Sequence, residues 1–349
     1  MAMTKHRLAA TALAALMFLT LTVPLQGLAA NKPVLYTAVV TMAYGADSGS
    51  GIYPTPDVQK PNQSTRRLGT LRAGSKLEVV DVLPNYVEIN YKGGTGFILR
   101  KRIDKVVALD PSTTPPYGVV PFRYFSTLDK ETPVMAAPDT GAEVLITLQK
   151  GARLAFIDME NGWAKLIFKR QYGYVNTALL PDLQMVAPSP EGGDSQTPIA
   201  VYTSFYNIAT NDANLNRMIN LEVCGQRMAR VMQPGEMLDF NKTVGPFHPR
   251  YGYKTAPGLV DGELVDSTGG GSCQASSTLY NVVLQLTGLT VTARAPHGND
   301  GAPYLPHGVD ASSGDLNFIF RNDYSFPIRI DYHVQDGAYF IAIYREVAA

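Results

Sequence analysis

Residues 269–280 read Gly269-Gly270-Gly271-Ser272-Cys273-Gln274-Ala275-Ser276-Ser277-Thr278-Leu279-Tyr280. A cysteine therefore stands between a glycine hinge and a segment in which apolar residues recur at helical spacing: Leu279, Val282, Val283 and Leu286. The pattern predicts an amphipathic helix that ends before Gly288 and has Cys273 at its N-terminal end. Unpaired backbone N–H groups and the positive end of the helix dipole favour an anion at that position. We therefore predict a reactive thiolate with oxyanion donors beside it.

A disulfide bridge is the alternative interpretation of Cys273. The chain has two cysteines, Cys224 and Cys273, which are too few for a disulfide framework but enough for one bridge in an oxidising compartment. Cys224 lies in a segment with helical apolar spacing, where a small buried thiol is ordinary. We therefore expect Cys224 in the core.

The first thirty residues have the pattern of an export signal. A short basic start (Lys5, His6, Arg7) precedes an apolar run over residues 8–25 and the small residues of the segment 27–30. We expect residues 1–30 to be a cleaved signal peptide and the protein to act in the cell wall or outside the cell. An uncleaved membrane anchor is the alternative, and it is the only membrane contact that we expect.

Charge and motifs exclude several functional classes. The chain has 30 basic and 30 acidic residues, so bulk charge gives no reason to expect nucleic-acid binding. No P-loop or dinucleotide fingerprint is present, and we expect no cofactor. A zinc site of Cys273, His248, His297 and His307 is conceivable by residue type, but no paired-ligand spacing supports it, and we expect no metal. The sequence predicts no oligomeric state.

Two segments repeat at a spacing of 77 residues. Six pairs carry the repeat: Gly74 and Gly151, Leu77 and Leu154, Tyr86 and Trp163, Gly96 and Gly173, Ile98 and Val175, and Ile103 and Leu180. In each copy, alternating apolar and polar residues follow a glycine, which predicts strands. The order of glycine turn, strand, Asn-containing turn, aromatic residue and Gly-aromatic-aliphatic strand resembles the bacterial SH3-like domain, and Asn161 to Leu166 follow it closely. The first copy departs from it, with Tyr86 where Trp is usual.

We therefore predict two small all-β SH3-like barrels, at residues 31–108 and 117–183. The resemblance implies attachment to cell-wall peptides, with Tyr86, Trp163 and Tyr174 as ligand candidates, whereas a role as spacers is the alternative. Proline, glycine and serine in residues 184–198 predict a flexible linker.

From residue 199 onward the pattern becomes mixed. A strand-like start, a helical stretch over residues 214–232, the cysteine helix and strands after Asp315 predict an α+β domain at residues 199–346. A thiolate needs a base or a cationic neighbour, and His297 and His307 both lie in turns where side chains converge on sites. His248 lies in another loop, whereas His333 falls in an expected strand.

The C-terminal residues resemble the VanW-like domain. The matching residues are Pro234-Gly235-Glu236, Phe240-Asn241, Gly245-Pro246, Gly252-Tyr253, Gly269 to Gly271 with Cys273-Gln274, Ser276 to Asn281, Arg294, His297, Tyr304, Gly308 and Asp310-Ala311. The Gly-Gly-Gly-x-Cys-Gln-x-Ser core is specific, although Leu238-Asp239 replaces the usual Phe-Ser. The resemblance implies, for some members, L,D-transpeptidase activity that crosslinks peptidoglycan, and an association with glycopeptide resistance.

The resemblance assigns roles by position. Cys273 is the expected nucleophile, His297 the general base and later acid, and Asp310 the group that orients the imidazole or holds substrate amines. Arg294 is expected to bind a substrate carboxylate, and the backbone N–H groups of residues 273–275 are the expected oxyanion donors. The remaining candidates for substrate or oxyanion binding are Gly271, Gln274, Ser276, Tyr304 and His307.

The sequence thus predicts a multidomain cell-wall protein whose cysteine transfers acyl groups of peptidoglycan stem peptides. A non-catalytic peptidoglycan-binding or envelope-organising protein, with a structural Cys273, is the competing hypothesis.

Overall fold

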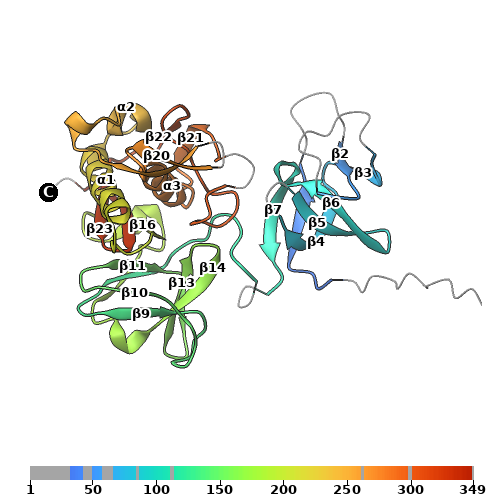
Figure 1. Cartoon of the computed structure of the whole chain (residues 1–349), viewed down its shortest axis with the longest axis horizontal. Coiled ribbons are helices and arrows are strands. Elements are labelled where there is room, and N and C mark those ends of the chain that lie inside the picture. The colour runs from blue at the N-terminus through green and yellow to red at the C-terminus, as the bar shows by residue number, and fades with distance from the viewer. Residues whose placement is uncertain are drawn as a thin grey trace, which may run out of the picture.

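The computed structural model describes residues 32–41, 49–56, 66–83, 86–110, 114–260, 263–297 and 301–347. Strands dominate these residues, and the α-helices α1 (Asp212–Met228), α2 (Phe240–Val244) and α3 (Ser272–Val283) all belong to the C-terminal part (Figure 1). The expected signal segment lies outside the described residues. Within those ranges, no helix has the length and apolar character needed to span a membrane.

The first region is a sheet with a short hairpin beside it. Its sheet has the strand order β6-β5-β4-β1-β7 and the hairpin pairs β2 with β3. The strands are β1 (Tyr36–Val40), β2 (Gly49–Ile52), β3 (Gly69–Arg72), β4 (Lys76–Val82), β5 (Tyr86–Tyr91), β6 (Gly94–Leu99) and β7 (Ile103–Ala108). Alternate residues of β1 and β4, such as Ala38 and Val79, fill a small core of their own.

The second region has two sheets, ordered β10-β9-β14-β13-β12 and β11-β8-β15. Its strands are β8 (Tyr124–Thr127), β9 (Thr132–Met135), β10 (Val144–Leu148), β11 (Arg153–Phe156), β12 (Asp158–Glu160), β13 (Trp163–Phe168), β14 (Gln171–Asn176) and β15 (Leu183–Met185). The predicted closed barrel is wrong for the described residues. The chain leaves β11 at Ile157 and enters β12 in the other sheet, which divides the strands between two sheets.

The 77-residue repeat is visible in the elements. The 3-10 turns Arg100–Arg102 and Thr177–Leu179 occupy equivalent positions, as do the strand starts Tyr86 and Trp163. Gly74 and Gly151 both have a left-handed backbone, with φ of 82° and 94°. The sequence spacing therefore reports a real structural correspondence, although the assignment of the first copy as an SH3-like domain stays a prediction.

The C-terminal part combines the three helices with three sheets, ordered β16-β24-β23-β17, β18-β22-β21 and β19-β20. Its strands are β16 (Pro198–Phe205), β17 (Arg230–Met232), β18 (Met237–Asp239), β19 (Thr255–Val260), β20 (Glu263–Thr268), β21 (Leu289–Arg294), β22 (Phe318–Asn322), β23 (Ile328–Gln335) and β24 (Ala338–Arg345). The expected closing strands correspond to β22, β23 and β24. Helix α3 packs on β16 and β24, which holds the cysteine end of the helix in place.

The second region and the C-terminal part share one hydrophobic core. The ring of Phe125 lies 5.9 Å from that of Phe340, and the ring of Phe168 lies 5.1 Å from that of Phe205. The Ala155 N–H donates to Thr203 Oγ1 across this junction at 2.9 Å. Figure 1 shows β11 directly below the C-terminal sheet.

The segment 184–198 is more ordered than its composition predicts. Residues of β15 pair with β8, and the 3-10 turn Pro190–Gly192 is capped by Ser189. The Ala187 N–H donates to Pro198 O at 2.9 Å, which folds the segment back on itself. Proline, glycine and serine are common in flexible linkers, but the same residues also form capped turns. Composition alone therefore does not distinguish the two. The predicted domain limits themselves stay predictions.

Candidate active site

The three glycines before α3 are required by the backbone. Gly269 and Gly271 are left-handed, with φ of 85° and 111°. A Cβ at Gly270 would lie 2.1 Å from the carbonyl oxygen of Ala256 in β19, so this residue has no room for a side chain. The glycines therefore allow the chain to pass against β19 and turn directly into the helix that carries Cys273.

Helix α3 is buried along nearly its whole length, and its polar side chains hold neighbouring segments. Ser277 Oγ donates to Ala311 O at 3.0 Å and accepts from Ala311 N at 2.9 Å. Asn281 Nδ2 donates to Val309 O at 2.7 Å. These bonds fasten residues 309–311 to the helix and fix the position of Asp310.

Gln274 and Ser276 have structural roles, which corrects their predicted roles in substrate or oxyanion binding. Gln274 is 1 % exposed and donates from Nε2 to Ser204 Oγ at 3.0 Å. Ser276 is fully buried and donates from Oγ to Ala311 O at 2.5 Å. Both side chains are occupied by the protein itself, because they lie on the core side of α3.

His297 and Asp310 form a buried pair. Asp310 Oδ2 accepts from His297 Nδ1 at 2.9 Å and from the His297 backbone N–H at 2.6 Å. Asp310 is 2 % exposed, so it orients the imidazole and is not accessible to substrate amines. Within the described part of the chain, His297 Nε2 is buried without a hydrogen-bond partner of ordinary geometry. Because Nδ1 is bound to Asp310, Nε2 is the ring nitrogen left to interact with Cys273.

Arg294 completes this cluster from β21. Its Nε donates to Asp310 O at 2.7 Å, and its Nη2 lies 3.1 Å from Asp310 Oδ1. Its guanidinium also lies over the Tyr280 ring at 5.3 Å. Arg294 thus positions Asp310 through Nε and Nη2, and its predicted role in binding a substrate carboxylate stays a prediction.

Cys273 is partly exposed and receives hydrogen bonds from Ser313. The Ser313 backbone N–H lies 3.5 Å from Cys273 Sγ, and Ser313 Oγ lies 3.6 Å from it. Cys224 is free and fully buried, in line with the expected core position, and Cys273 is also free. The two sulfur atoms form no bridge in this structure, which favours the reactive interpretation of Cys273.

The charges in the site favour a thiolate and an imidazolium. Burial raises the pKa of the Cys273 thiol, but hydrogen bonding to His297, the His297 charge and the Ser313 donors together hold this pKa below its ordinary value. Burial lowers the pKa of His297, but Asp310 and the Cys273 thiolate raise it to about 9. Burial also raises the pKa of Asp310, but its bonds to His297 and the charge of Arg294 lower it overall. The opposite shifts of Cys273 and His297 favour a thiolate–imidazolium pair.

Fewer backbone N–H groups are available as oxyanion donors than predicted. The N–H groups of Gln274 and Ala275 both donate to Gly271 O, at 2.9 and 3.1 Å. Among the described residues, none accepts a hydrogen bond from the Cys273 N–H, as expected for the second residue of a helix. Of the three predicted donors, the Cys273 N–H is therefore the one available to an oxyanion.

The sequence reasoning missed Ser313 and Arg217. Arg217 projects from α1, and its Cγ would lie 3.2 Å from a Cβ at Gly271. Arg217 precedes the buried residues Asn220, Leu221 and Cys224 at helical spacing. The sequence signal that could have identified Arg217 is its place, as a charged residue, at a core-facing position of the helix. Tyr304, a predicted site residue, lies in the same neighbourhood: burial raises the pKa of its phenol, and the Cys273 charge raises it further.

The other histidines lie elsewhere. His307 Nδ1 lies 2.5 Å from Arg100 Nη1, and its backbone pairs with Tyr117, so this residue contacts the first region. Its predicted site role stays a prediction. His248 Nδ1 accepts from the Arg250 N–H at 3.2 Å and caps a 3-10 turn. In the ranges that the structure describes, no three or more histidine, cysteine or acidic residues gather as metal ligands.

Comparison with known proteins assigns two parts of the chain. Residues 216–344 match the family described as VanW like protein, and residues 132–181 match the bacterial SH3 domain. The C-terminal domain is VanW-like. Over 153 residues the chain is 36% identical to the uncharacterized protein YoaR of Bacillus subtilis (strain 168). This alignment covers 43% of the chain and 48% of YoaR, so the chain spans about half the length of that relative.

Solved structures add little to the assignment of the VanW-like domain. NlpC2 from Trichomonas vaginalis is 8% identical, with 57% of each chain covered and a TM-score of 0.19. NlpC1 from the same organism is 11% identical, with 91% of this chain and 94% of that chain covered and a TM-score of 0.18.

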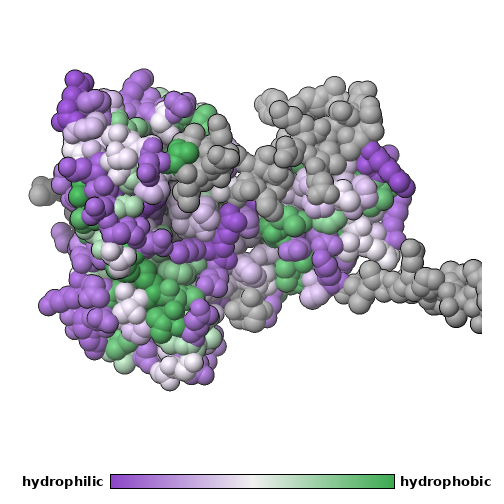
Figure 2. Space-filling view, viewed as in Figure 1, coloured by the Kyte–Doolittle hydropathy of each residue, from purple (hydrophilic) through white to green (hydrophobic). Residues whose placement is uncertain are grey.

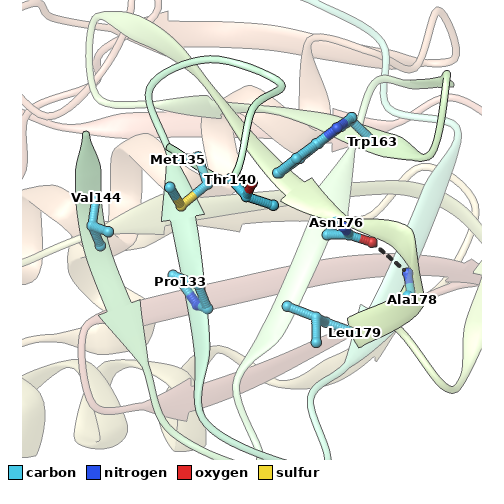
Figure 3. Close-up of a pocket in the computed structure, with 8 residues that line it drawn as sticks. All are labelled: Pro133, Met135, Thr140, Val144, Trp163, Asn176, Ala178 and Leu179. Carbon is cyan, nitrogen blue, oxygen red and sulfur yellow. Dashed lines mark hydrogen bonds between the residues drawn. The ribbon is translucent and has the colours of Figure 1, made fainter. Parts of the chain in front are cut away.

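The SH3 domain beside the VanW-like domain has a cavity of about 400 Å³. Figure 3 shows Trp163 above the capping bond from the Ala178 N–H to Asn176 Oδ1 on one side of it, and Val144 on the opposite side. The lining residues are Pro133, Met135, Thr140, Val144, Trp163, Asn176, Ala178 and Leu179. Figure 2 shows hydrophobic residues gathered on the surface of this domain. Trp163 therefore retains its predicted role as a ligand candidate.

The other two aromatic candidates differ from Trp163. Tyr86 is 1 % exposed and packs edge-on against Tyr53 at 6.1 Å, so it is a core residue and its predicted ligand role is corrected. Tyr174 is half-buried opposite Met135 and does not line the cavity. The two repeats thus differ in the exposure of their equivalent aromatic residues.

Proposed function

We propose that this protein is exported and acts on the bacterial cell wall, where its VanW-like domain transfers acyl groups of peptidoglycan stem peptides through Cys273. The observation that carries the proposal is the cluster of Cys273, His297 and Asp310, in which the charges favour a thiolate beside an imidazolium. The family match and the neighbouring SH3 domain support association with the cell wall.

The first half-reaction is acylation of the cysteine. The Cys273 thiolate attacks the scissile carbonyl carbon, and the Cys273 N–H donates to the oxyanion that forms. The C–N bond then breaks, His297 Nε2 gives its proton to the departing amine, and a thioester remains. Asp310 stabilises the imidazolium before this transfer and keeps Nε2 aimed at the reacting atoms.

The second half-reaction resolves the thioester. An acceptor amine attacks the thioester carbonyl and gives a proton to His297 Nε2, a new amide forms, and Cys273 leaves as the thiolate. The starting ion pair is thereby restored. Water in place of the amine gives a carboxylic acid, so the same site supports crosslinking or hydrolysis.

Product analysis tests this function. The full chain is incubated with a disaccharide tetrapeptide and an amine acceptor, and the products are separated and weighed by mass spectrometry. The wild type is expected to form the crosslinked product, whereas Cys273→Ala forms none while keeping the wild-type melting temperature. Equal product from both proteins would refute the assignment of the nucleophile.

A non-catalytic wall-binding function is the second candidate, because the Trp163 cavity offers an apolar site outside the VanW-like domain. It predicts binding to purified peptidoglycan that is insensitive to Cys273→Ala and is lost in Trp163→Ala.

A further inference from the structure

Arg217 is a half-buried cation that has no acidic partner among the described residues. Its Nη2 donates to Pro257 O at 2.6 Å, and among the described residues it forms no ion pair with a carboxylate. Half-buried guanidinium groups are normally compensated by an anion, because water no longer solvates them fully. Arg294, in contrast, forms an ion pair with Asp310. Arg217 therefore has capacity for an anion that the described residues do not supply.

The place of this cation connects it with the nucleophile. Arg217 packs against Gly271, the residue that begins α3, and its Nη1 would lie 3.8 Å from a Cβ at that position. Cys273 follows two residues later. Burial lowers the pKa of Arg217, and the groups that oppose this effect are Tyr304, Cys273 and Tyr206, all of them weak acids. Gly271 was predicted to contact substrate, and its missing side chain leaves room for the Arg217 side chain two residues before Cys273.

We infer that Arg217 binds a carboxylate of the acyl donor that lies within one residue of the scissile bond. A guanidinium binds a carboxylate through paired N–H donors, which gives orientation as well as affinity. One residue spans about 3.8 Å between neighbouring Cα atoms, so a free carboxylate on the leaving residue lies close to the carbon that Cys273 attacks. The preferred donors are then peptides that end at the leaving residue.

This inference rests on the proposed acyl transfer for its substrate, but its anion site is tested separately with small alkylating reagents. Iodoacetamide and iodoacetate attack the same thiol and differ in charge. In the full-length wild type, we expect iodoacetate to alkylate Cys273 faster relative to iodoacetamide than it alkylates a free thiol. Arg217→Met should lower the iodoacetate rate by about fivefold or more and change the iodoacetamide rate by less than about twofold. Arg217→Lys should keep most of the preference.

Arg227→Met is the matched control, because Arg227 is also half-buried on α1 but lies over Tyr251 at 5.0 Å, away from α3. It should leave both rates unchanged, and melting temperatures identify any variant that fails to fold. An equal loss of both rates in Arg217→Met would show that the residue activates the thiol, and unchanged rates would show that it binds no anion near it. Either result overturns the inference.

A peptide pair separates this inference from the function beneath it. Acyl-enzyme formation is followed with a tetrapeptide donor that has either a free or an amidated C-terminus. We expect amidation to raise KM tenfold or more in the wild type and to have little effect in Arg217→Met. Equal acylation by both peptides would refute the carboxylate site while leaving the function standing. No acylation by either peptide would refute the function, whereas the alkylation rates would still decide on the anion site.

Discussion

Replacing Asp310 by Asn removes one charge from the buried cluster while keeping its shape. In the wild type, the pKa of His297 rises from an ordinary 6.5 to about 9, which corresponds to about 3 kcal/mol of favourable interaction for the imidazolium. This interaction comes from Asp310 and the Cys273 thiolate, against the cost of burial. Without the Asp310 charge, burial dominates, and we expect the pKa of His297 to fall and that of Cys273 to rise.

The rate at which iodoacetamide alkylates Cys273 reports this change. At neutral pH the rate in Asp310→Asn should fall by roughly 10- to 100-fold, and its midpoint should move to higher pH, because only the thiolate reacts. Asp315→Asn removes an exposed carboxylate nearby and should leave the profile unchanged. A wild-type profile in Asp310→Asn would refute the claim that Asp310 supports the ion pair.

The free energy of unfolding should depend on pH through the same groups. A raised His297 pKa contributes stability that is fully present below pH 6.5 and is lost as the pH rises through about 9. The lowered Asp310 pKa contributes stability above the unfolded-state value of the carboxyl, and this contribution is lost as the pH falls through the folded-state value. The lowered Cys273 pKa acts in the opposite direction, because its contribution to stability increases as the pH rises and the thiol of the unfolded chain stays protonated. The two contributions offset each other between pH 6.5 and 9, so the wild type should lose only part of the His297 contribution in this range, and any such decline should be smaller in Asp310→Asn.

Three further predictions concern the scaffold and the SH3 domain. Gly270→Ala should destabilise the chain by about 3 kcal/mol or more in denaturant titrations, because its Cβ meets Ala256 O. Gly308→Ala, with φ of 84° and open space, should cost about 1–2 kcal/mol. Equal costs for the two variants would contradict the packing argument. Thr203→Val should cost about 1–3 kcal/mol by leaving the Ala155 N–H unpaired in the shared core, and an unchanged unfolding midpoint would contradict that junction. Trp163→Ala should reduce co-sedimentation with purified peptidoglycan without changing Cys273 alkylation, and undiminished binding would exclude the cavity as the wall-binding site.

Local chemistry was the part of the site that the sequence could predict. Cys273 after three glycines and His297 in a turn could be proposed from the residues themselves, whereas Asp310, thirteen residues after His297, was proposed only through the resemblance to the VanW-like domain. Ser313 and Arg217 were missed because they reach the cysteine from segments 40 and 56 positions away along the chain. The side-chain directions of Gln274 and Ser276 could not be predicted either, since they depend on which face of α3 meets β16.

The fold was predictable where it depends on repeats and alternation. The spacing of 77 residues recurs in strands and 3-10 turns, and the closing strands follow their apolar patterns. The shared core between the SH3 domain and the VanW-like domain was not predictable. Residues of β16 that face β11 look like any other buried strand, and nothing local reveals that their partners come from the preceding domain.

Intact mass spectrometry of the acylated protein tests the central claim most directly. The full chain is mixed with a disaccharide tetrapeptide, without an acceptor, and the wild type is compared with Cys273→Ala. The proposed mechanism predicts a wild-type adduct with the mass of the donor minus its leaving residue, located at Cys273 by peptide mapping, and no adduct on Cys273→Ala. Equal release of product by the wild type and by Cys273→Ala, with no adduct on either protein, would contradict covalent catalysis by this cysteine.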